Sequence, residues 1–128
     1  MQPQGIERRR APRAAVNFQI QLATKALPTK ADSAPATLKD ISSNGLACTF
    51  HEPLNEMTMV RLDVKFPKDQ DMHRIEGVVV RCDKRRGISP PSYEIAIYFA
   101  EMSEAGRKSL ERFVAQAIAQ LPPQRATK

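Results

Sequence analysis

Four arginines lie close together near the N-terminus of this 128-residue chain, at Arg8, Arg9, Arg10 and Arg13. A guanidinium group is planar, so it can donate two hydrogen bonds at once to a phosphate or to O6 and N7 of guanine, and it can stack on a base. Half of the formal net charge of +6 lies in residues 7–13, which carry four arginines and one glutamate. The cluster indicates an anionic ligand, although a solvated basic arm that only aids solubility is the alternative.

A second polar stretch, residues 40–45, follows about thirty residues later. Asp40 can accept hydrogen bonds from amino groups on a base edge, and Ser42 can donate to a ligand oxygen or accept an amino hydrogen. Asn44 and Gly45 both tolerate positive φ, which predicts a hairpin turn centred on them that presents the acid and the hydroxyl. On its own, the stretch is also typical of an ordinary Asx turn.

The pattern of the segments around these two stretches predicts mainly short strands. Apolar and polar residues alternate with period two, which is typical of strands with one buried face, and Gly77 is expected at a bulge or bend. Many short strands in a small domain predict a barrel or a sandwich. The six predicted strands span residues 16–22, 37–41, 46–50, 60–66, 75–82 and 93–99.

The period changes after the last strand, which predicts one amphipathic helix. Ser103 is a suitable N-cap, and apolar residues then recur at helical spacing from Leu110 to Leu121. Pro122 and Pro123 end the pattern. The apolar stripe of this helix needs a partner surface, most simply an open end or a face of the β domain.

Composition argues against several classes of protein. Cys48 and Cys82 lack CxxC spacing and no secretory signal precedes them, which indicates reduced thiols in a cytoplasmic protein. His51 and His73 are not placed at metal-ligand spacing. No apolar run approaches the ~20 residues that span a bilayer. The sequence thus predicts no metal, no cofactor and no membrane span.

Two further classes are disfavoured by missing motifs. No nucleophile–base pair, P-loop or carboxylate dyad is visible, so an enzyme is not expected. A small basic barrel that binds RNA or DNA stays open as an alternative because of the positive charge. Aromatic residues make up only 5% of the chain, however, and no aromatic-rich strand supplies the stacking that such proteins use.

Together, the two polar stretches, the strand order and the terminal helix resemble the PilZ domain family over roughly residues 7–120. Arg9 and Arg13 match its RxxxR motif. Asp40, Ser42 and Gly45 match its [D/N]xSxxG motif. RxxxR is common in basic segments, so the specificity of the resemblance lies in the pair of motifs at this separation.

The resemblance implies a bacterial source and a six-stranded antiparallel β-barrel that binds the second messenger cyclic di-GMP. It implies that Arg9 and Arg13 clamp phosphate and guanine, and that Arg8 can reach a second, stacked nucleotide. Ala96 adds a methyl group where the last strand of the family often has glycine. The expected ligand contacts are Arg8, Arg9, Arg10, Arg13, Asp40, Ser42, Gly45 and Ala96.

With no enzymatic or membrane domain attached, such a domain is expected to act through a downstream protein partner, as a monomer or weak dimer. The alternative within the family is an interaction module that does not bind nucleotide, and the intact arginine pair argues against it. The expected division of the chain is a flexible Arg-rich arm (1–13), a PilZ-like barrel with its C-terminal helix (14–121) and a tail (122–128).

Overall fold

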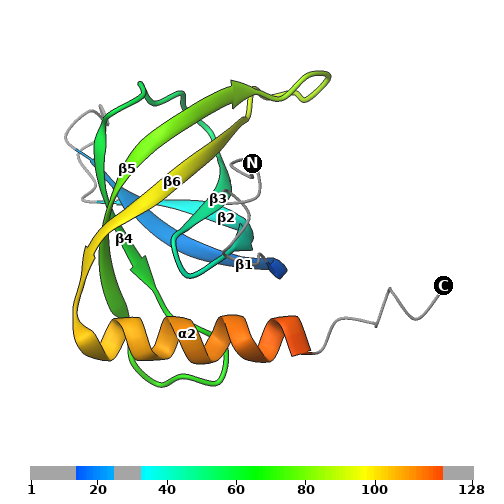
Figure 1. Ribbon diagram of the computed structural model, residues 1–128. Coiled ribbons are helices and arrows are strands. Elements are labelled where there is room, and N and C mark those ends of the chain that lie inside the picture. Colours follow the sequence, from blue (N-terminus) through cyan, green and yellow to red (C-terminus); the bar gives the residue numbers. More distant parts are fainter. Residues whose placement is uncertain (1–13, 25–32, 120–128) are drawn as a thin grey trace, which may run out of the picture.

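Six antiparallel strands close into a barrel in the computed structural model, which describes residues 14–24 and 33–119. The order around the barrel is β1-β2-β3-β6-β5-β4, and β4 pairs with β1 to complete it (Figure 1). The predicted six-stranded antiparallel barrel with a C-terminal helix is confirmed. The elements are β1 (Ala14–Ala23), β2 (Ala34–Ile41), β3 (Gly45–Phe50), β4 (Met59–Val64), β5 (His73–Lys84), β6 (Tyr93–Met102) and α2 (Glu104–Ala119).

Some expectations lie outside the described residues: the arm over 1–13, the tail over 122–128, and the last turn of the helix at Leu121. Four strands are clearly longer than the alternation pattern predicted. Strand β1 spans Ala14–Ala23 rather than 16–22, and β2 begins at Ala34 rather than Thr37. Strand β5 runs over His73–Lys84 rather than 75–82, and β6 continues to Met102 rather than to residue 99. Strand β4 instead ends at Val64 rather than at Phe66. Pairing with neighbouring strands accounts for the added residues. Pro35 pairs with Gln21 on β1 only, because the pairing of β2 with β3 begins at Thr37, so one side of the strand is unpaired at the proline.

The barrel interior is filled by aliphatic side chains, as the strand alternation requires. Inward-facing residues include Leu38, Leu62, Ile75 and Ile95, each with no exposed surface. Gly77 does lie at an irregularity, because the β5–β6 register shifts between Glu76 and Gly77. The predicted bend is therefore confirmed.

Helix α2 lies across one end of the barrel (Figure 1). Its N-terminus is capped as expected, since the Gly106 N–H donates to Ser103 Oγ at 3.0 Å. Leu110 and Val114 are buried against the barrel core. Burying a side chain such as Leu110 contributes about 1.5–3 kcal/mol. The apolar stripe thus covers an open end of the barrel, which was the simplest expectation.

Two further findings concern the described residues only. In the part of the chain that it describes, no helix has the length and hydropathy needed to cross a bilayer. Among the same residues, no group of three or more histidine, cysteine, aspartate or glutamate side chains is arranged to hold a metal ion.

A buried histidine and an aspartate join the β4–β5 connection to β5 beneath α2. The two side chains, His73 Nε2 and Asp69 Oδ2, lie 3.1 Å apart. Hydrogen bonds from the backbone N–H of Asp71 and the side chains of Ser109 and His73 lower the pKa of Asp69 to about 2. A depressed carboxyl pKa stabilises the fold above the ordinary value of 3.8, and that contribution is lost as the pH falls toward 2.

We therefore expect Asp69→Asn to lower the melting temperature near neutral pH, and the difference from the unmodified protein to shrink as both are acidified. Thermal unfolding followed by circular dichroism between about pH 7 and pH 2 measures this. The matched control is Asp71→Asn, because Asp71 is exposed and contributes its backbone N–H rather than its carboxylate. A difference that stays constant down to the lowest pH would contradict the ionic origin.

Candidate ligand-binding site

The turn between β2 and β3 is built around the hydroxyl group of Ser42. Ser42 Oγ accepts from the N–H groups of Asn44 (3.1 Å) and Gly45 (3.3 Å), and the Ser42 N–H donates to the Gly45 carbonyl at 2.9 Å. Ser43 and Asn44 are therefore the two tip residues. Ser42 has no exposed surface, so in this conformation it shapes the turn rather than offering its hydroxyl to a ligand.

The expected turn chemistry at Asn44 and Gly45 is wrong in two respects. The tip lies one residue earlier than predicted, and neither residue has positive φ. In the described ranges, positive φ occurs at Met57, Lys68 and Gly87. Glycine is required at 45 for a different reason, because a Cβ there would overlap the carbonyl oxygen of Ile97 on β6.

Helix α2 and strand β6 hold the tip of the turn in place. Arg107 Nη1 donates to the Ser43 carbonyl at 3.1 Å, and the Phe99 N–H donates to the Asn44 carbonyl at 2.8 Å. These contacts join residues far apart in the sequence, so the motif alone did not reveal them. The turn is thus fixed from the helix side and from the sheet side.

An irregularity in β2 decides which way Asp40 points. Leu38 pairs with Cys48 and Asp40 pairs with Ala47, so Lys39 is an extra residue on β2. Strict alternation from the buried Leu38 would send Asp40 inward. The extra residue shifts the alternation by one position, so that the side chain of Asp40 lies on the outer face of the barrel. Asp40 is accordingly half-buried, and Ile41 is buried.

Cross-strand pairing places Asp40 in a row of mostly small residues on the outside of the barrel. Asp40 pairs with Ala15 on β1 and with Ala47 on β3. Ala47 pairs with Ala96 on β6, and Ala96 pairs with Arg81 on β5. The row therefore runs from an acid, across two alanines, to a cation; Ala47 is buried and Ala96 is half-buried.

Charged groups border this row. Arg81 Nε lies 3.1 Å from Asp83 Oδ2, with both side chains mostly exposed. Lys39 Nζ lies 3.7 Å from Glu94 Oε1. Exposed pairs such as these contribute little to stability and can exchange partners with an incoming ligand.

The structure brings together four of the predicted site residues: Asp40 and Ala96 in the row, and Ser42 and Gly45 beside it in the turn. The arginines at 8, 9, 10 and 13 lie outside the described residues. Ala14, however, directly follows Arg13 and pairs with Ile41. The arm is thus attached to the barrel beside Asp40.

Sequence reasoning missed Ala47 and Arg81. Ala47 stands between the buried residues Leu46 and Cys48, so alternation could have placed it on the outer face. Arg81 follows an extra residue, Val80, in the β5–β6 register, and no local signal marks that shift.

Comparison with known proteins bears on the family and the fold. A family model described as the PilZ domain matches residues 7–116. Comparison with curated proteins gives no match. Among solved structures, the chain is similar to the PilZ domain of Escherichia coli YcgR with c-di-GMP, with TM-score 0.65 and 14% identity over 94% of this chain and 98% of that one.

Two longer proteins contain a similar domain. Bacillus subtilis MotI/DgrA, an inhibitor of motility, gives a TM-score of 0.69 at 16% identity, over 95% of this chain and 59% of that one. The K. pneumonia MrkH–c-di-GMP complex gives 0.67 at 18%, over 94% and 55%. The chain thus spans somewhat more than half the length of each. At these identities the structural likeness establishes the fold, and the family match covers most of the sequence. The chain belongs to the PilZ domain family.

Proposed function

We propose that this domain is a non-enzymatic receptor for cyclic di-GMP. The observation that carries the proposal is the pairing of Ala14 with Ile41 and of Ala15 with Asp40. This pairing attaches the RxxxR arm to the barrel at the edge where the DxSxxG turn presents its acid. Support also comes from family membership and from the similar YcgR and MrkH structures, which are described with c-di-GMP.

The arginines and Asp40 would recognise different parts of the nucleotide. Arg9 and Arg13 donate to phosphate oxygens and to guanine O6 and N7, and Arg8 and Arg10 add positive charge and a stacking surface. Asp40 accepts from the N1–H and N2 amino groups of guanine. These charge-assisted contacts must offset the ordering of the arm, which costs about 1–2 kcal/mol per residue fixed.

Ser42 and Gly45 act through the turn, and Ala96 acts through its small size. Ser42 holds the tip residues by hydrogen bonds to two backbone N–H groups. Gly45 lets β3 approach β6 closely. Ala96, together with Ala47, forms the floor on which the nucleotide lies.

Ordering of the arm changes the surface next to Ala14, and we propose that a downstream protein partner in the bacterial cytoplasm reads this change. No resident cofactor or metal takes part. In solution the free domain is a monomer or a weak dimer. Nucleic acid is not the ligand, because the few aromatic residues do not supply a stacking strand.

Isothermal titration calorimetry with cyclic di-GMP tests the proposal, with thermal shift as a second readout. We expect saturable heat and a raised melting temperature at ligand concentrations of about tens of micromolar. Cyclic di-AMP is the matched control, since it retains the phosphodiesters but lacks the guanine edge that Asp40 reads. If cyclic di-GMP produced no heat and no thermal shift, the proposal would fail. The remaining interpretation would be an interaction module of the PilZ fold that binds no nucleotide.

The small-residue row makes a separate prediction. Ala96→Leu is expected to weaken cyclic di-GMP binding by about tenfold or more, because the longer side chain occupies the floor beside Ala47. Calorimetric titration measures the loss. The control is Ala100→Leu, an exposed position on the same strand outside the row. Equal affinities of the two variants would show that the nucleotide does not lie on this face.

A further inference from the structure

A groove runs along one side of α2, between that helix, the start of β1 and the connection from β4 to β5. It has two adjoining parts, of about 450 and 160 Å³. Pro67, Lys68, Phe113 and Gln116 line both parts, so the two form one continuous channel. The proposed nucleotide site uses other residues, except that Ala15 lies at the edge of both.

The wider part of the groove is largely apolar. Its walls include Val16, Phe18, Pro67, Phe113 and Ala117. The ring of Phe113 packs edge-on against Phe18, with centroids 5.7 Å apart, and lies 5.2 Å from the ring of the buried Phe66. These contacts hold the aromatic wall in place, so an apolar side chain would enter a preformed site.

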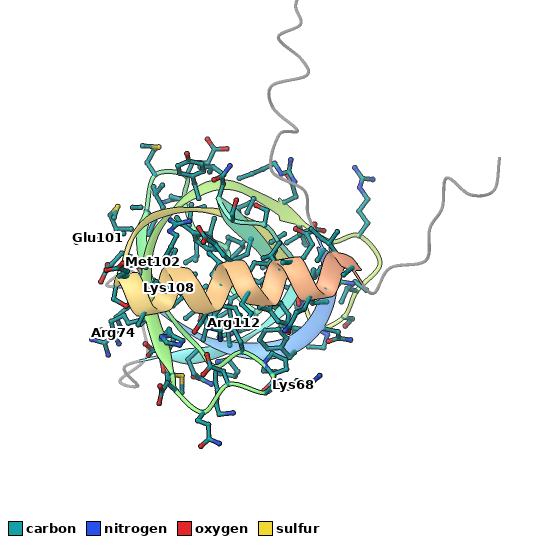
Figure 2. All side chains as sticks on the ribbon, turned by 60° about the horizontal axis from the view of Figure 1, so that its bottom comes forward. Lys68, Arg74, Glu101, Met102, Lys108 and Arg112 are labelled. Carbon is teal, nitrogen blue, oxygen red and sulfur yellow. The ribbon has the colours of Figure 1, made fainter. Side chains whose placement is uncertain are left out.

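Two cations and one carboxylate line the narrower part of the groove. Lys68 and Arg112 border it, and Lys108 lies one helical turn before Arg112 on the face that carries α2 (Figure 2). In the part of the chain that the structure describes, none of the three has an ion-pair partner. Asp69 also lines this part and keeps its negative charge near neutral pH. Its carboxylate interacts with His73, Ser109 and its own loop rather than with Lys68 or Arg112, so the two cations outnumber the one carboxylate.

The backbone at Lys68 adds a second observation. Lys68 has φ of 72°, in the left-handed region, although it is not glycine. Non-glycine residues adopt this region uncommonly, and Met57, which does not line the groove, does so too. At Lys68, this conformation places a cationic residue at the edge of the groove.

Charge decides what the groove can accept. Residues 1–13 carry a net +3, and residues 120–128 contain Arg125 and Lys128 but no acidic residue. Both ends of the chain are therefore repelled by Lys68 and Arg112. A second copy with net charge +6 is also disfavoured. The phosphates of a nucleic acid could pair with the cations, but a nucleic acid has no aliphatic group to pack against the apolar part of the wall.

We propose that this groove docks an acidic, apolar peptide segment of a partner protein. A leucine- or phenylalanine-type side chain enters the wide part beside Phe18 and Phe113. Carboxylates of the same segment pair with Lys68 and Arg112. Docking on this surface does not depend on nucleotide, so it stands or falls separately from cyclic di-GMP binding.

The test is fluorescence polarisation with the full chain and no nucleotide. The probes are fluorescein-labelled decapeptides in which glutamates alternate with leucine or phenylalanine, alongside matched sets with glutamine or lysine in place of glutamate. We expect the glutamate set to bind and the other two to bind at least about tenfold more weakly. Amide chemical shifts should move at Phe18, Lys68 and Phe113.

Two variants and one control locate the binding. Lys68→Glu with Arg112→Glu should reduce affinity by about tenfold or more, and Ala117→Trp should block the wide part. The control is Arg86→Glu, in the β5–β6 loop at the end of the barrel opposite α2 (Figure 1). Circular dichroism confirms that each variant is folded.

Three outcomes would overturn the proposal. The first is no binding by any glutamate peptide up to about millimolar concentration, the weak end of measurable affinity. The second is equal binding by the glutamate and glutamine sets, or by the double variant and the Arg86→Glu control. The third is tighter binding of an oligothymidylate through the same residues, which would make the groove a nucleic-acid site.

Discussion

Replacing Arg9 or Arg13 by alanine is expected to weaken cyclic di-GMP binding by about 1.5–3 kcal/mol each, the range for hydrogen bonds to charged groups. That loss is roughly ten- to a hundredfold in the dissociation constant. The physical reason is geometric as well as electrostatic, because each guanidinium offers two parallel donors to a phosphate or a guanine edge. Calorimetric titration of the single and double variants measures the effect.

Lysine variants separate charge from geometry. Arg13→Lys retains the positive charge but loses the paired donors and the stacking plane, so it should recover only part of the lost affinity. Arg125→Ala, near the other end of the chain, is the control for a general loss of positive charge. Wild-type affinity in Arg9→Ala and Arg13→Ala would remove the arm from the site, whatever the barrel binds.

The second large effect concerns stability. Gly45→Ala is expected to destabilise the fold by about 3 kcal/mol, at the upper end for overpacking, because the added Cβ would overlap backbone atoms. The ideal position of that Cβ meets the Ile97 carbonyl oxygen and lies 3.3 Å from Tyr98 Cα. Backbone on a paired strand cannot yield as a flexible side chain can. Urea unfolding monitored by circular dichroism gives the free energy of unfolding.

Two comparisons identify the cause. Gly87→Ala introduces positive-φ strain at φ of 72° but meets no atom within 4 Å, so it should cost less, about 1–2 kcal/mol. Gly45→Asn should be at least as damaging as Gly45→Ala, because asparagine tolerates a left-handed turn but its Cβ overlaps the same backbone atoms. If Gly45→Asn were well tolerated, the close approach of β6 would not explain the glycine. The prediction from the sequence, that residue 45 needs a positive φ, would then be the better explanation.

Much of the fold could be predicted from the chain because its signals are local. Alternation in β1, β4 and β6 marked half-buried strands, and the change to helical spacing after Ser103 marked α2 with its cap in place. These patterns depend on which face of a strand or helix is buried, and neighbouring residues carry that information. The two polar motifs could be recognised in the same way.

The site depended on information that no local stretch contains. The extra residue at Lys39 appears only when β2 is paired with β3, yet it turns Asp40 outward. Ala15, Ala47, Ala96 and Arg81 come from four different strands and fall in one row with Asp40 through register alone. Register in a closed barrel is set by long-range pairing, since a shift of one residue reverses every side chain.

By itself, the sequence determined the β-rich class, the capped terminal helix, the charge of the arm and the two motifs, because composition and periodicity are properties of consecutive residues. Only the tertiary structure decided that Ser42 holds the turn and that glycine at 45 permits close strand approach. It also decided that α2 and Pro67 enclose a cationic groove. Such features arise where distant segments pack together, and their atoms meet only after the barrel has closed.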